Sequence, residues 1–570
     1  NPVIVRATEQ WFIGMETPMP TDLEKNCHPE RSGEAAQSKD LRSTGESAKP
    51  QTFRQRALDE IKKVKWDPAW GEERISNMIA TRPDWCISRQ RIWGVPIAVF
   101  LCEKCGTPLN DAAVNKSIVE LFHKEGADAW YIHEASALLP KGTKCPCGNE
   151  EFRKEMDILD VWFESGASWH AVLEQEPELT YPADLYTEGG DQHRGWFHSS
   201  LLTSVAVRGI APYKMVATSG WTLDEQGRAF SKSLGNGVDP VDIAKRLGGE
   251  IVRLWVASVD FREDVAASEN LMQRVSDNYR KLRNTLRFLL SNLSDFDPAT
   301  NSIAFGDMQL PDKYILARMS EVDKKIRASY EAFEFHRAYH VLNTFVNTDL
   351  SAIYLDLSKD ILYTFAPNHP DRRSAQTALW RIAEALTRLI APILSFTADE
   401  VWQLLPKVKG RAPSVHLALF PEASEIASFN TETLLADFAH LLELRKDILD
   451  LLELKRKEGT IGKSLEARVI FSFVETSTDE NILRLNAYRL ILAQLFGTSQ
   501  VTFKYVPAYA DLNSNLMTMV ESAIGTKCER CWRYTEDVGQ EAKYPTVCLR
   551  CAEALAAIHF APYTTTEATG

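Results

Sequence analysis

The sequence predicts a multidomain fold in which an α/β region, a helical bundle and an α+β region ending in a metal module follow one another. Between residues 81 and 240, short apolar runs broken by Gly, Pro and Asp alternate with helical stretches, which is typical of a parallel sheet covered by helices. After Glu269, apolar residues recur at helical spacing, which indicates a bundle. Residues 516–570 contain two Cys-x-x-Cys pairs. A chain of 570 residues is long enough for several such domains.

The composition excludes some classes of protein. The net charge is -13 at pH 7, so contact with nucleic acid must come from local basic patches rather than from the chain as a whole. No apolar run reaches the ~18 residues needed to cross a bilayer, and no secretory signal is visible. Together with paired cysteines, this predicts a cytoplasmic protein without a membrane partner. The chain opens with "NPVIVRATEQWFIGME", without an initiator methionine, so we expect it to begin inside a longer protein.

The first eighty residues contain an interruption. Residues 1–20 predict a strand and a turn, and the pattern becomes helical from Phe53. The stretch 21–52 has no aromatic residue and almost no large aliphatic one. It cannot bury enough apolar surface to offset the entropy of ordering, so we expect a disordered insertion.

The α/β region extends over residues 81–268. Its strand-like pieces include "IWGVPIAVF", "DILDVWF" and "YKMVATSGWTL". The segment "VDPVDIAKRLGGEIVRLWVAS" begins a helix, with Asp239 as the N-cap and Pro240 in the first turn.

The helical bundle is expected over residues 269–425. Its apolar stripes are explained by core packing, and they comprise Leu271, Val275, Tyr279, Leu282, Leu286, Leu289, Ile315, Met319, Val322, Ile326, Tyr330, Leu379, Ile382, Leu386 and Leu389. Residues 426–515 then predict a further helix and two strands, "ARVIFSFVE" and "QVTFKYV".

The C-terminal cysteines have the spacing of a four-thiolate zinc site. The pairs Cys528/Cys531 and Cys548/Cys551 are separated by sixteen residues, which lets two knuckles converge on one ion. Basic and aromatic residues beside a rigid knuckle suit single-stranded RNA. The alternative is a purely structural zinc knob with ordinary surface arginines. These neighbours are Arg530, Trp532, Arg533, Tyr534 and Arg550.

An earlier cysteine set predicts a second zinc site, within an insertion at about residues 100–150. Cys102 and Cys105 are followed, after 39 residues, by Cys145 and Cys147. The segments "CEKCG" and "CPCG" each end in a knuckle glycine, which argues against buried thiols without a ligand. Four thiolates leave no open coordination position, so the predicted role is structural.

The stretch "GRAFSKSLGN", residues 227–236, places Lys232 in a loop of small residues. A mobile cation suits a polyphosphate, because it can follow charge that moves during a reaction. A solvated turn is the alternative explanation.

Four motifs together resemble the class I aminoacyl-tRNA synthetases for branched aliphatic amino acids, and most closely the bacterial isoleucyl type. They are "RPDWCISRQRIWGVPI", "DVWFESG", "EGGDQHRGWFHSSL" and "GRAFSKSLGN", and the terminal "CERCWRY" with "CLRC" is similar to the C-terminal zinc segment of that type. The resemblance covers nearly the whole chain except the 21–52 insertion. It implies an isoleucine–tRNA ligase that activates L-isoleucine with ATP and Mg²⁺ and transfers it to tRNA(Ile), with two Zn²⁺ ions and a monomeric state.

By this resemblance, "AFSKS" occupies the place of the family's KMSKS loop, which stabilises the pyrophosphate leaving group. Ser231, Lys232 and Ser233 are then the catalytic loop residues, with Lys232 contacting ATP. The sequence departs from the family pattern, because Ala229 replaces the first lysine and Phe230 replaces the methionine.

The resemblance also implies an adenylate site. Glu188 is expected to contact the aminoacyl-adenylate through the substrate ammonium, since a carboxylate suits that charge. Asp191 and Gln192 are expected near the polar atoms of the adenylate. Trp162 and Trp196 are expected as walls of the side-chain pocket, with ordinary core packing as the alternative.

The family's HIGH motif and most of its editing insertion do not occur in this sequence. The resemblance therefore implies the C-terminal portion of a synthetase, expected to be inactive alone. Residues 1–80 would return from the editing insertion to the catalytic core, and 81–268 would form the C-terminal half of a Rossmann-like domain. Residues 269–425 would bind the anticodon, 426–515 would form a junction and 516–570 the zinc module. The alternative is a non-catalytic tRNA-binding paralogue.

The expected anticodon-binding bundle has a basic segment near its start. These residues offer phosphate contacts to tRNA, with a solvated helix face as the alternative. They are Arg274, Arg280, Lys281, Arg283 and Arg287.

Overall fold

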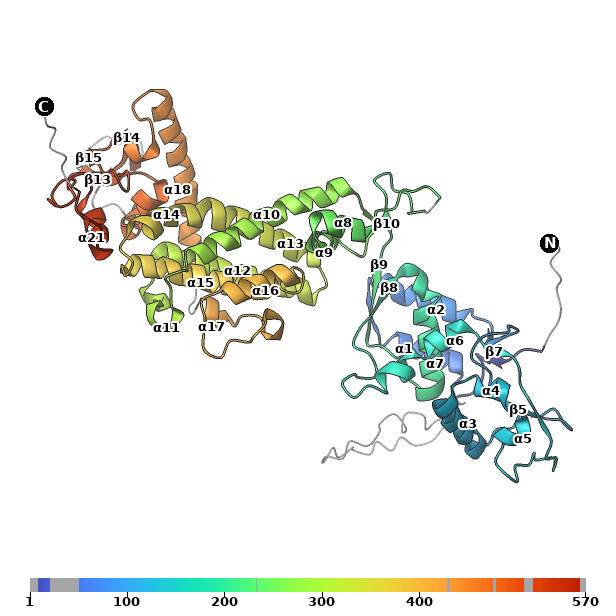
Figure 1. Ribbon diagram of the computed structural model, residues 1–570. Helices are drawn as coiled ribbons and strands as arrows, with labels where there is room; N and C mark the ends of the chain where they lie inside the picture. Colours follow the sequence, from blue (N-terminus) through green and yellow to red (C-terminus); the bar gives the residue numbers. More distant parts are fainter. Residues whose placement is uncertain are drawn as a thin grey trace, which may run out of the picture. The chain divides into compact units, whose positions relative to one another are not determined.

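The computed structural model describes residues 9–20, 51–231, 233–427, 431–474, 478–506 and 516–563. They divide into two compact units (Figure 1). The first unit comprises Asn1–Thr222 and Phe261–Asp264, and the second comprises Leu223–Asp260 and Val265–Gly570. The boundary between the two compact units at residue 222 lies inside the range 81–268 expected for the α/β region, and the short segment 261–264 returns to the first unit.

A three-stranded parallel sheet is the centre of the first unit, so the predicted class of sheet is confirmed. Of the strand-like runs named above, only the one at residues 213–223 supplies a strand of this sheet, whereas the run at 157–163 forms an antiparallel strand, Ile158–Leu159, and the start of a helix, Val161–Gly166. The order of the parallel sheet is β2-β9-β8, formed by Lys65–Asp67, Met215–Ser219 and Tyr186–Gly189. The register aligns Trp66 and Tyr186 on either side of Val216. The first four residues of β9 are buried, since helices cover a parallel sheet on its faces.

Three helices pack around this sheet. They are α1 (Phe53–Ile61), α2 (Trp70–Ala80) and α7 (Trp196–Arg208). α7 is buried from Phe197 to Val205, so it is an internal helix of the core rather than an amphipathic surface helix. The smaller elements beside this core are β1 (Phe12–Ile13), β3 (Trp85–Cys86), β4 (Ser88–Arg89), β7 (Ile158–Leu159), α6 (Val161–Gly166) and a π-helix (Trp169–Leu173).

Residues 21–50, within the predicted disordered insertion, lie outside the described residues. The ends of this segment meet in the fold. Pro18 and Thr52 form an antiparallel bridge, and the Met19 amide donates to the Gln51 carbonyl at 2.9 Å. The Thr52 hydroxyl caps α1 by accepting from the Gln55 amide. Gln51 and Thr52 therefore belong to the fold, which corrects the predicted end of the insertion.

The first cysteine set lies in a small subdomain with its own core. A hairpin pairs β5 (Phe100–Cys102) with β6 (Phe152–Lys154). The rings of Phe100 and Trp130 lie 4.9 Å apart at the centre of this core. The helices of the subdomain are α3 (Ala112–Glu125), α4 (Ala129–Ile132) and α5 (Ala135–Leu138).

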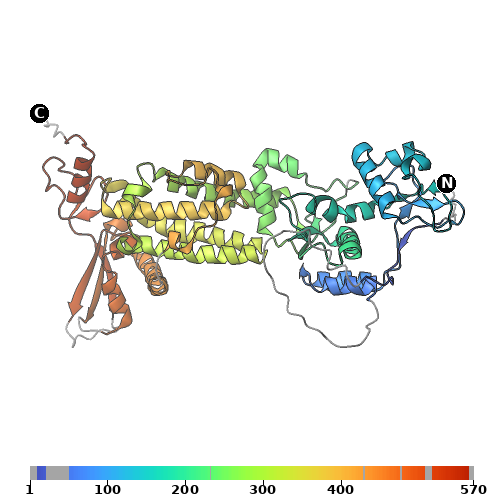
Figure 2. The same cartoon turned by 90° about the horizontal axis from the view of Figure 1, so that it is seen from below.

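The second unit is dominated by long helices that run alongside one another (Figure 2). The side chain of Asp239 accepts from the Val241 amide at 2.8 Å, so the predicted N-cap is confirmed. Most of the predicted apolar stripes are buried in one continuous core. The elements are β10 (Thr222–Leu223), β11 (Val265–Ala266), α8 (Pro240–Leu247), α9 (Gly249–Ser258), α10 (Glu269–Ser291), α11 (Pro298–Asn301), α12 (Leu310–Glu331), α13 (Phe335–Thr344), a π-helix (Phe345–Leu355), α14 (Asp356–Thr364), α15 (Pro370–Ile390), α16 (Ser395–Leu404) and α17 (Ala423–Ile426).

A mixed three-stranded sheet follows the bundle. β12 (Ala467–Val474) pairs in parallel with β13 (Gln500–Val506) and antiparallel with β14 (Leu516–Ser522). The two strands predicted from sequence are confirmed, but β14 falls inside the range expected for the zinc module. The remaining elements are α18 (Glu432–Lys457), α19 (Glu480–Ala487), α20 (Leu492–Phe496), β15 (Thr526–Lys527), β16 (Tyr534–Thr535) and α21 (Leu549–Ala557). Among the described residues, none of these helices has the length and apolar character of a membrane span.

Candidate functional site

The polar residues that the resemblance assigns to the adenylate lie at the carboxyl end of β8. Glu188 is the exposed penultimate residue of this strand, and a 3₁₀ turn, Gly190–His193, follows directly. Ligands of parallel α/β sheets bind outside the carboxyl ends of the strands. The fold therefore brings Glu188, Asp191 and Gln192 to an edge that suits a ligand.

Gln192 organises the turn between β8 and α7. Its side-chain oxygen accepts from the Trp196 amide at 2.9 Å, and its Nε2 donates to the Asp191 carboxylate at 2.9 Å. The first bond satisfies one of the free amides at the start of α7. Gln192 thus fixes Asp191 and Trp196 relative to each other.

The two tryptophans differ in their surroundings. Trp196 is half-buried, its ring stacks on Tyr186 at 4.1 Å, and its Nε1 donates to the Ser165 carbonyl at 3.0 Å. Trp162 is 44% exposed and its ring covers Gly195, where an added Cβ would lie 3.0 Å from the indole. Trp162 therefore keeps an open apolar face, whereas Trp196 contributes mainly to the core.

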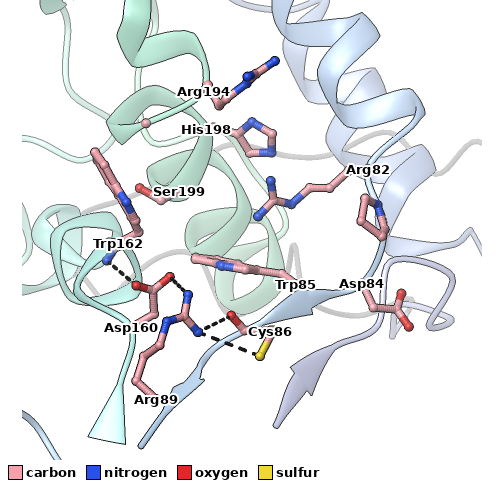
Figure 3. Close-up of a pocket in the computed structure, with 12 residues that line it drawn as sticks. Arg82, Asp84, Trp85, Cys86, Arg89, Asp160, Trp162, Arg194, His198 and Ser199 are labelled. Atoms are coloured by element: carbon pink, nitrogen blue, oxygen red, sulfur yellow. Dashed lines mark hydrogen bonds and ion pairs between the residues drawn. The ribbon is translucent and has the colours of Figure 1, made fainter. Parts of the chain in front are cut away.

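Trp162 also borders a cavity of about 300 Å³ (Figure 3). Asp160 positions this tryptophan, because one carboxylate oxygen accepts from the Trp162 amide at 3.4 Å and the other pairs with Arg89 at 2.9 Å. Sequence reasoning missed the cavity, since its walls come from three separate segments. They are Arg82, Pro83, Asp84, Trp85, Cys86, Arg89, Asp160, Trp162, Arg194, Gly195, His198 and Ser199.

The loop "GRAFSKSLGN" has a defined internal scaffold. The Ser231 and Ser233 hydroxyls lie 2.7 Å apart, and the Ser231 amide donates to the Asn236 side chain at 2.9 Å. Asn236 donates in turn to Asp224 at 2.8 Å. This hydrogen bond, together with backbone amides, lowers the pKa of Asp224 to about 2. Lys232 itself lies outside the described residues.

The first cysteine quartet has the geometry of a metal site. Sγ atoms of Cys102 and Cys147 lie 3.6 Å apart, and those of Cys105 and Cys145 lie 3.5 Å apart. Four sulfurs bound to zinc at ~2.3 Å would form a tetrahedron with edges of about 3.8 Å. The four sulfurs of this quartet all fall within 4.8 Å of one another. Their spacing fits a structural Zn²⁺ ion.

The C-terminal quartet is fully buried and equally compact. Its four Sγ atoms also lie within 4.8 Å of one another, with Cys531 and Cys548 3.8 Å apart. Trp532 directly follows Cys531 and has a left-handed φ of 63°. At the equivalent position of the first quartet, directly after Cys105, Gly106 has a φ of 71°. This conformation costs a residue with a side chain roughly 1 kcal/mol. It presents Trp532 to solvent, 60% exposed.

The arginines of the zinc module bind other parts of this chain, which favours the alternative of a structural zinc knob for these side chains. Arg550 forms two hydrogen bonds to Asp360 at 2.9 and 3.0 Å, and Arg533 contacts the same carboxylate at 3.1 Å. Arg530 donates to the Thr364 and Tyr363 carbonyls. These bonds attach the module to α14. The two cations lower the pKa of Asp360 against the opposing effect of its burial.

Comparison with known families identifies the three regions in order. Residues 3–268 match tRNA synthetases class I (I, L, M and V), residues 312–471 match the anticodon-binding domain of tRNA ligase, and residues 525–554 match a zinc finger found in FPG and IleRS. The chain belongs to the class I tRNA synthetases. The first cysteine quartet lies within the residues that match the synthetase family, and the second lies within the residues that match the zinc finger.

Several curated isoleucine–tRNA ligases are similar to this synthetase chain over nearly all its length. The protein of Syntrophotalea carbinolica is 45% identical over 559 residues, that of Moorella thermoacetica 44% over 560, and that of Geobacter sulfurreducens 45% over 561. Each alignment covers 97% of this chain and 56% of the relative. The chain thus spans about half the length of the curated relatives it matches.

Proposed function

We propose that this chain provides part of an isoleucine–tRNA ligase, which activates L-isoleucine with ATP and transfers it to tRNA(Ile). One observation carries the proposal: relatives of that name are 42–45% identical over 97% of the chain. Three family matches in the same order agree with it.

In the proposed reaction, an isoleucine carboxylate oxygen bonds to the α-phosphorus of ATP while the bond to pyrophosphate breaks. Glu188 faces the substrate ammonium, and Trp162 offers its open face to the aliphatic side chain. The Ser231–Ser233 loop stabilises charge on the leaving pyrophosphate through Lys232. Mg²⁺ bound with ATP would neutralise phosphate charge. In the second step, a ribose hydroxyl of tRNA attacks the isoleucyl carbonyl and AMP leaves.

A chimera tests the activity. This chain replaces the aligned part, 56%, of the Geobacter sulfurreducens relative, and ATP–pyrophosphate exchange and aminoacylation are measured. We expect both activities with isoleucine, and loss of exchange in Glu188→Gln. Glu178→Gln, an exposed change in the same unit, is the control. A chimera that binds tRNA(Ile) without any exchange would favour the non-catalytic paralogue.

Binding of tRNA by this chain is a separate part of the proposal. Residues 312–471 match an anticodon-binding domain, and Arg274 and Arg287 are exposed on α10. Arg280 and Arg283 are less available, since they pair with Asp277 and Glu400. We expect affinity for tRNA(Ile) to exceed that for an unrelated tRNA and to fall with added salt. Equal affinity for both tRNAs would refute specific recognition.

Trp532 is the proposed stacking residue of the zinc module, because its indole is exposed while the neighbouring arginines are engaged. Stacking of one base on an aromatic ring contributes about 1–3 kcal/mol. Trp532→Ala should therefore weaken tRNA(Ile) binding at least fivefold without changing zinc content. Trp221→Ala, which removes an exposed tryptophan of the other unit, is the matched control.

We also propose that both quartets hold Zn²⁺. Their sulfurs stand 3.5–3.8 Å apart, far beyond the ~2.05 Å of a disulfide. Thiols that stay reduced fit the cytoplasm, which is the proposed location.

A further inference from the structure

A second cavity opens beside the one in Figure 3, and arginines line it. Its volume is about 490 Å³, and it shares Arg82, Pro83, Arg194 and His198 with the first cavity. We call it the arginine pocket; its lining residues are Arg74, Asn77, Met78, Thr81, Arg82, Pro83, Arg194 and His198. It contains three cationic side chains and no carboxylate.

Two of the three guanidinium groups lie over aromatic rings, and no acid among the described residues pairs with any of the three. Arg74 lies over the Trp70 ring at 5.6 Å and Arg82 over the Trp85 ring at 5.5 Å. Among the described residues, neither they nor Arg194 form an ion pair. A tryptophan face positions a guanidinium group while leaving its N–H donors free. The charge of Asp160 acts on Arg82, but Asp160 is already paired with Arg89.

His198 supplies a second, independent observation. Its side chain is only 3% exposed, and neither ring nitrogen makes a well-formed hydrogen bond to a described residue, although the backbone of His193 lies close enough to act on the ring. Figure 3 shows the His198 ring between the Arg194 and Arg82 side chains. Burial, with the neighbouring charges of Arg82 and Arg194, lowers the pKa of His198 to about 3, so the ring is neutral. A neutral imidazole must still carry one N–H donor.

A buried donor without an acceptor destabilises the fold unless a ligand or water satisfies it. Here the unsatisfied donor and the unsatisfied Nε of Arg82 lie in the wall of one cationic cavity. A ligand that accepts several hydrogen bonds and carries negative charge would satisfy both. A phosphate group has both properties, and arginine forks match its oxygens.

We propose that the arginine pocket binds a phosphate group, carried by an RNA strand or by a nucleotide, with Arg74, Arg82, Arg194 and His198 as its donors. The proposal uses none of the residues assigned to isoleucine activation. It can therefore fail or succeed independently of the proposed ligase function.

Binding is measured on the full chain with three probes: inorganic phosphate, ATP and a short single-stranded RNA. Arg74→Ala and Arg194→Ala remove exposed side chains, so the fold is retained, and each should weaken binding of at least one probe about fivefold or more. Arg153→Ala, an exposed arginine of the same unit outside the pocket, is the matched control and should leave affinity unchanged. The probe with the largest loss identifies the source of the phosphate.

His198→Leu separates a ligand-binding role from a structural one. Because the ring nitrogens make no well-formed hydrogen bond to a described residue, the apolar variant should be about as stable as the parent protein. It should nevertheless weaken phosphate binding, and in the parent protein the His198 ring resonances should shift when the preferred probe is added. Failure of all three probes to bind, or equal affinity in the pocket variants and in Arg153→Ala, would overturn the proposal.

Discussion

At the scale of single residues, short series of hydrogen bonds position residues of the candidate site. Asp224 holds Asn236, and Asn236 in turn holds the Ser231 amide, so a buried carboxylate sets the shape of the exposed loop around Lys232. Gln192 does the same for Asp191 and the start of α7. In the first case, the loop that carries Lys232 in the proposed reaction depends on Asp224 and Asn236, to which no substrate contact is assigned.

Lys232 gives the prediction at this scale. In the chimera with the Geobacter relative, Lys232→Ala should slow ATP–pyrophosphate exchange by about a hundredfold, because a preorganised charge contributes on the order of 3 kcal/mol to such transition states. The KM for isoleucine should change little, since the charge acts as pyrophosphate departs. Lys245→Ala, exposed on α8, is the control. Ala229→Lys should raise the rate or leave it unchanged. An exchange rate indifferent to Lys232→Ala would identify the loop as a solvated turn.

At the scale of elements, buried polar groups form hydrogen bonds between helices. The apolar pattern alone would bury these helices against one another without determining which residues meet. Glu250 of α9 accepts from the Phe396 and Thr397 amides at the start of α16. Asp312, in the first turn of α12, accepts from Ser374 of α15 at 2.5 Å and from Tyr354 at 2.7 Å. These groups fix which helices meet and in what register.

Asp312 makes part of the bundle's stability depend on pH. Burial raises the pKa of Asp312 to about 7, whereas an unfolded aspartate titrates near 3.9. The folded state therefore holds a proton that the unfolded state releases, and the free energy of unfolding falls as pH rises from about 4 to 7. The loss is at most about 4 kcal/mol. Hydrogen exchange of α12 amides, corrected for intrinsic rates, should show less protection at pH 8 than at pH 5.

Asp312→Asn should remove this dependence, because an amide does not ionise. Asp307→Asn, an exposed change just before α12, should retain it. Equal pH dependence in the parent protein and in Asp312→Asn would show that another group titrates.

Asp360 tests the attachment of the zinc module. Asp360→Asn leaves Arg533 and Arg550 without their anionic partner, which should cost about 2 kcal/mol after allowance for partial exposure. We expect faster hydrogen exchange in α21 and easier proteolysis before residue 526, with zinc content unchanged. Asp356→Asn, on the same helix and paired only with exposed Lys359, is the matched control. Unchanged exchange in α21 would mean that apolar contacts hold the module.

At the scale of the whole molecule, two metal modules occupy two separate compact units. The first quartet lies in the unit with the parallel sheet, and the second lies in the unit with the bundle. Each module has a small core of its own, which includes all four cysteines in the C-terminal module and Cys102 and Cys145 in the first. Modules of this size depend on the metal for folding free energy.

Elemental analysis should therefore give two zinc ions per chain. Cys528→Ser should reduce the content to about one and unfold the C-terminal module, while the helical circular dichroism of the bundle is retained. Cys86→Ser, outside both quartets, should keep two ions. Clearly fewer than two ions in the parent protein would eliminate one of the sites.

The sequence predicted what depends on local pattern. Alternating strand-like and helical runs predicted a parallel sheet, helical spacing predicted the bundle, and cysteine spacing predicted the quartets, since each pattern is encoded within a few turns of chain. The strand-like runs did not locate the sheet, because the run at 157–163 forms an antiparallel strand and a helix and the strand at 65–67 lies before the expected region. The arginine pocket and the engagement of Arg530, Arg533 and Arg550 could not be predicted. Both depend on partners more than thirty residues away, and an exposed and an ion-paired arginine look alike in sequence.

The bridge between Pro18 and Thr52 has a consequence for protein engineering. Because the two chain ends of the 21–50 segment already touch, the fold does not rely on that segment to span any distance. The entropy of closing a loop changes only slowly with its length, by about 0.6 kcal/mol for each doubling. We therefore expect that the segment can be shortened to a tight turn, or replaced by an affinity tag or a fluorescent domain. The sheet that carries Glu188 should keep its register in each case.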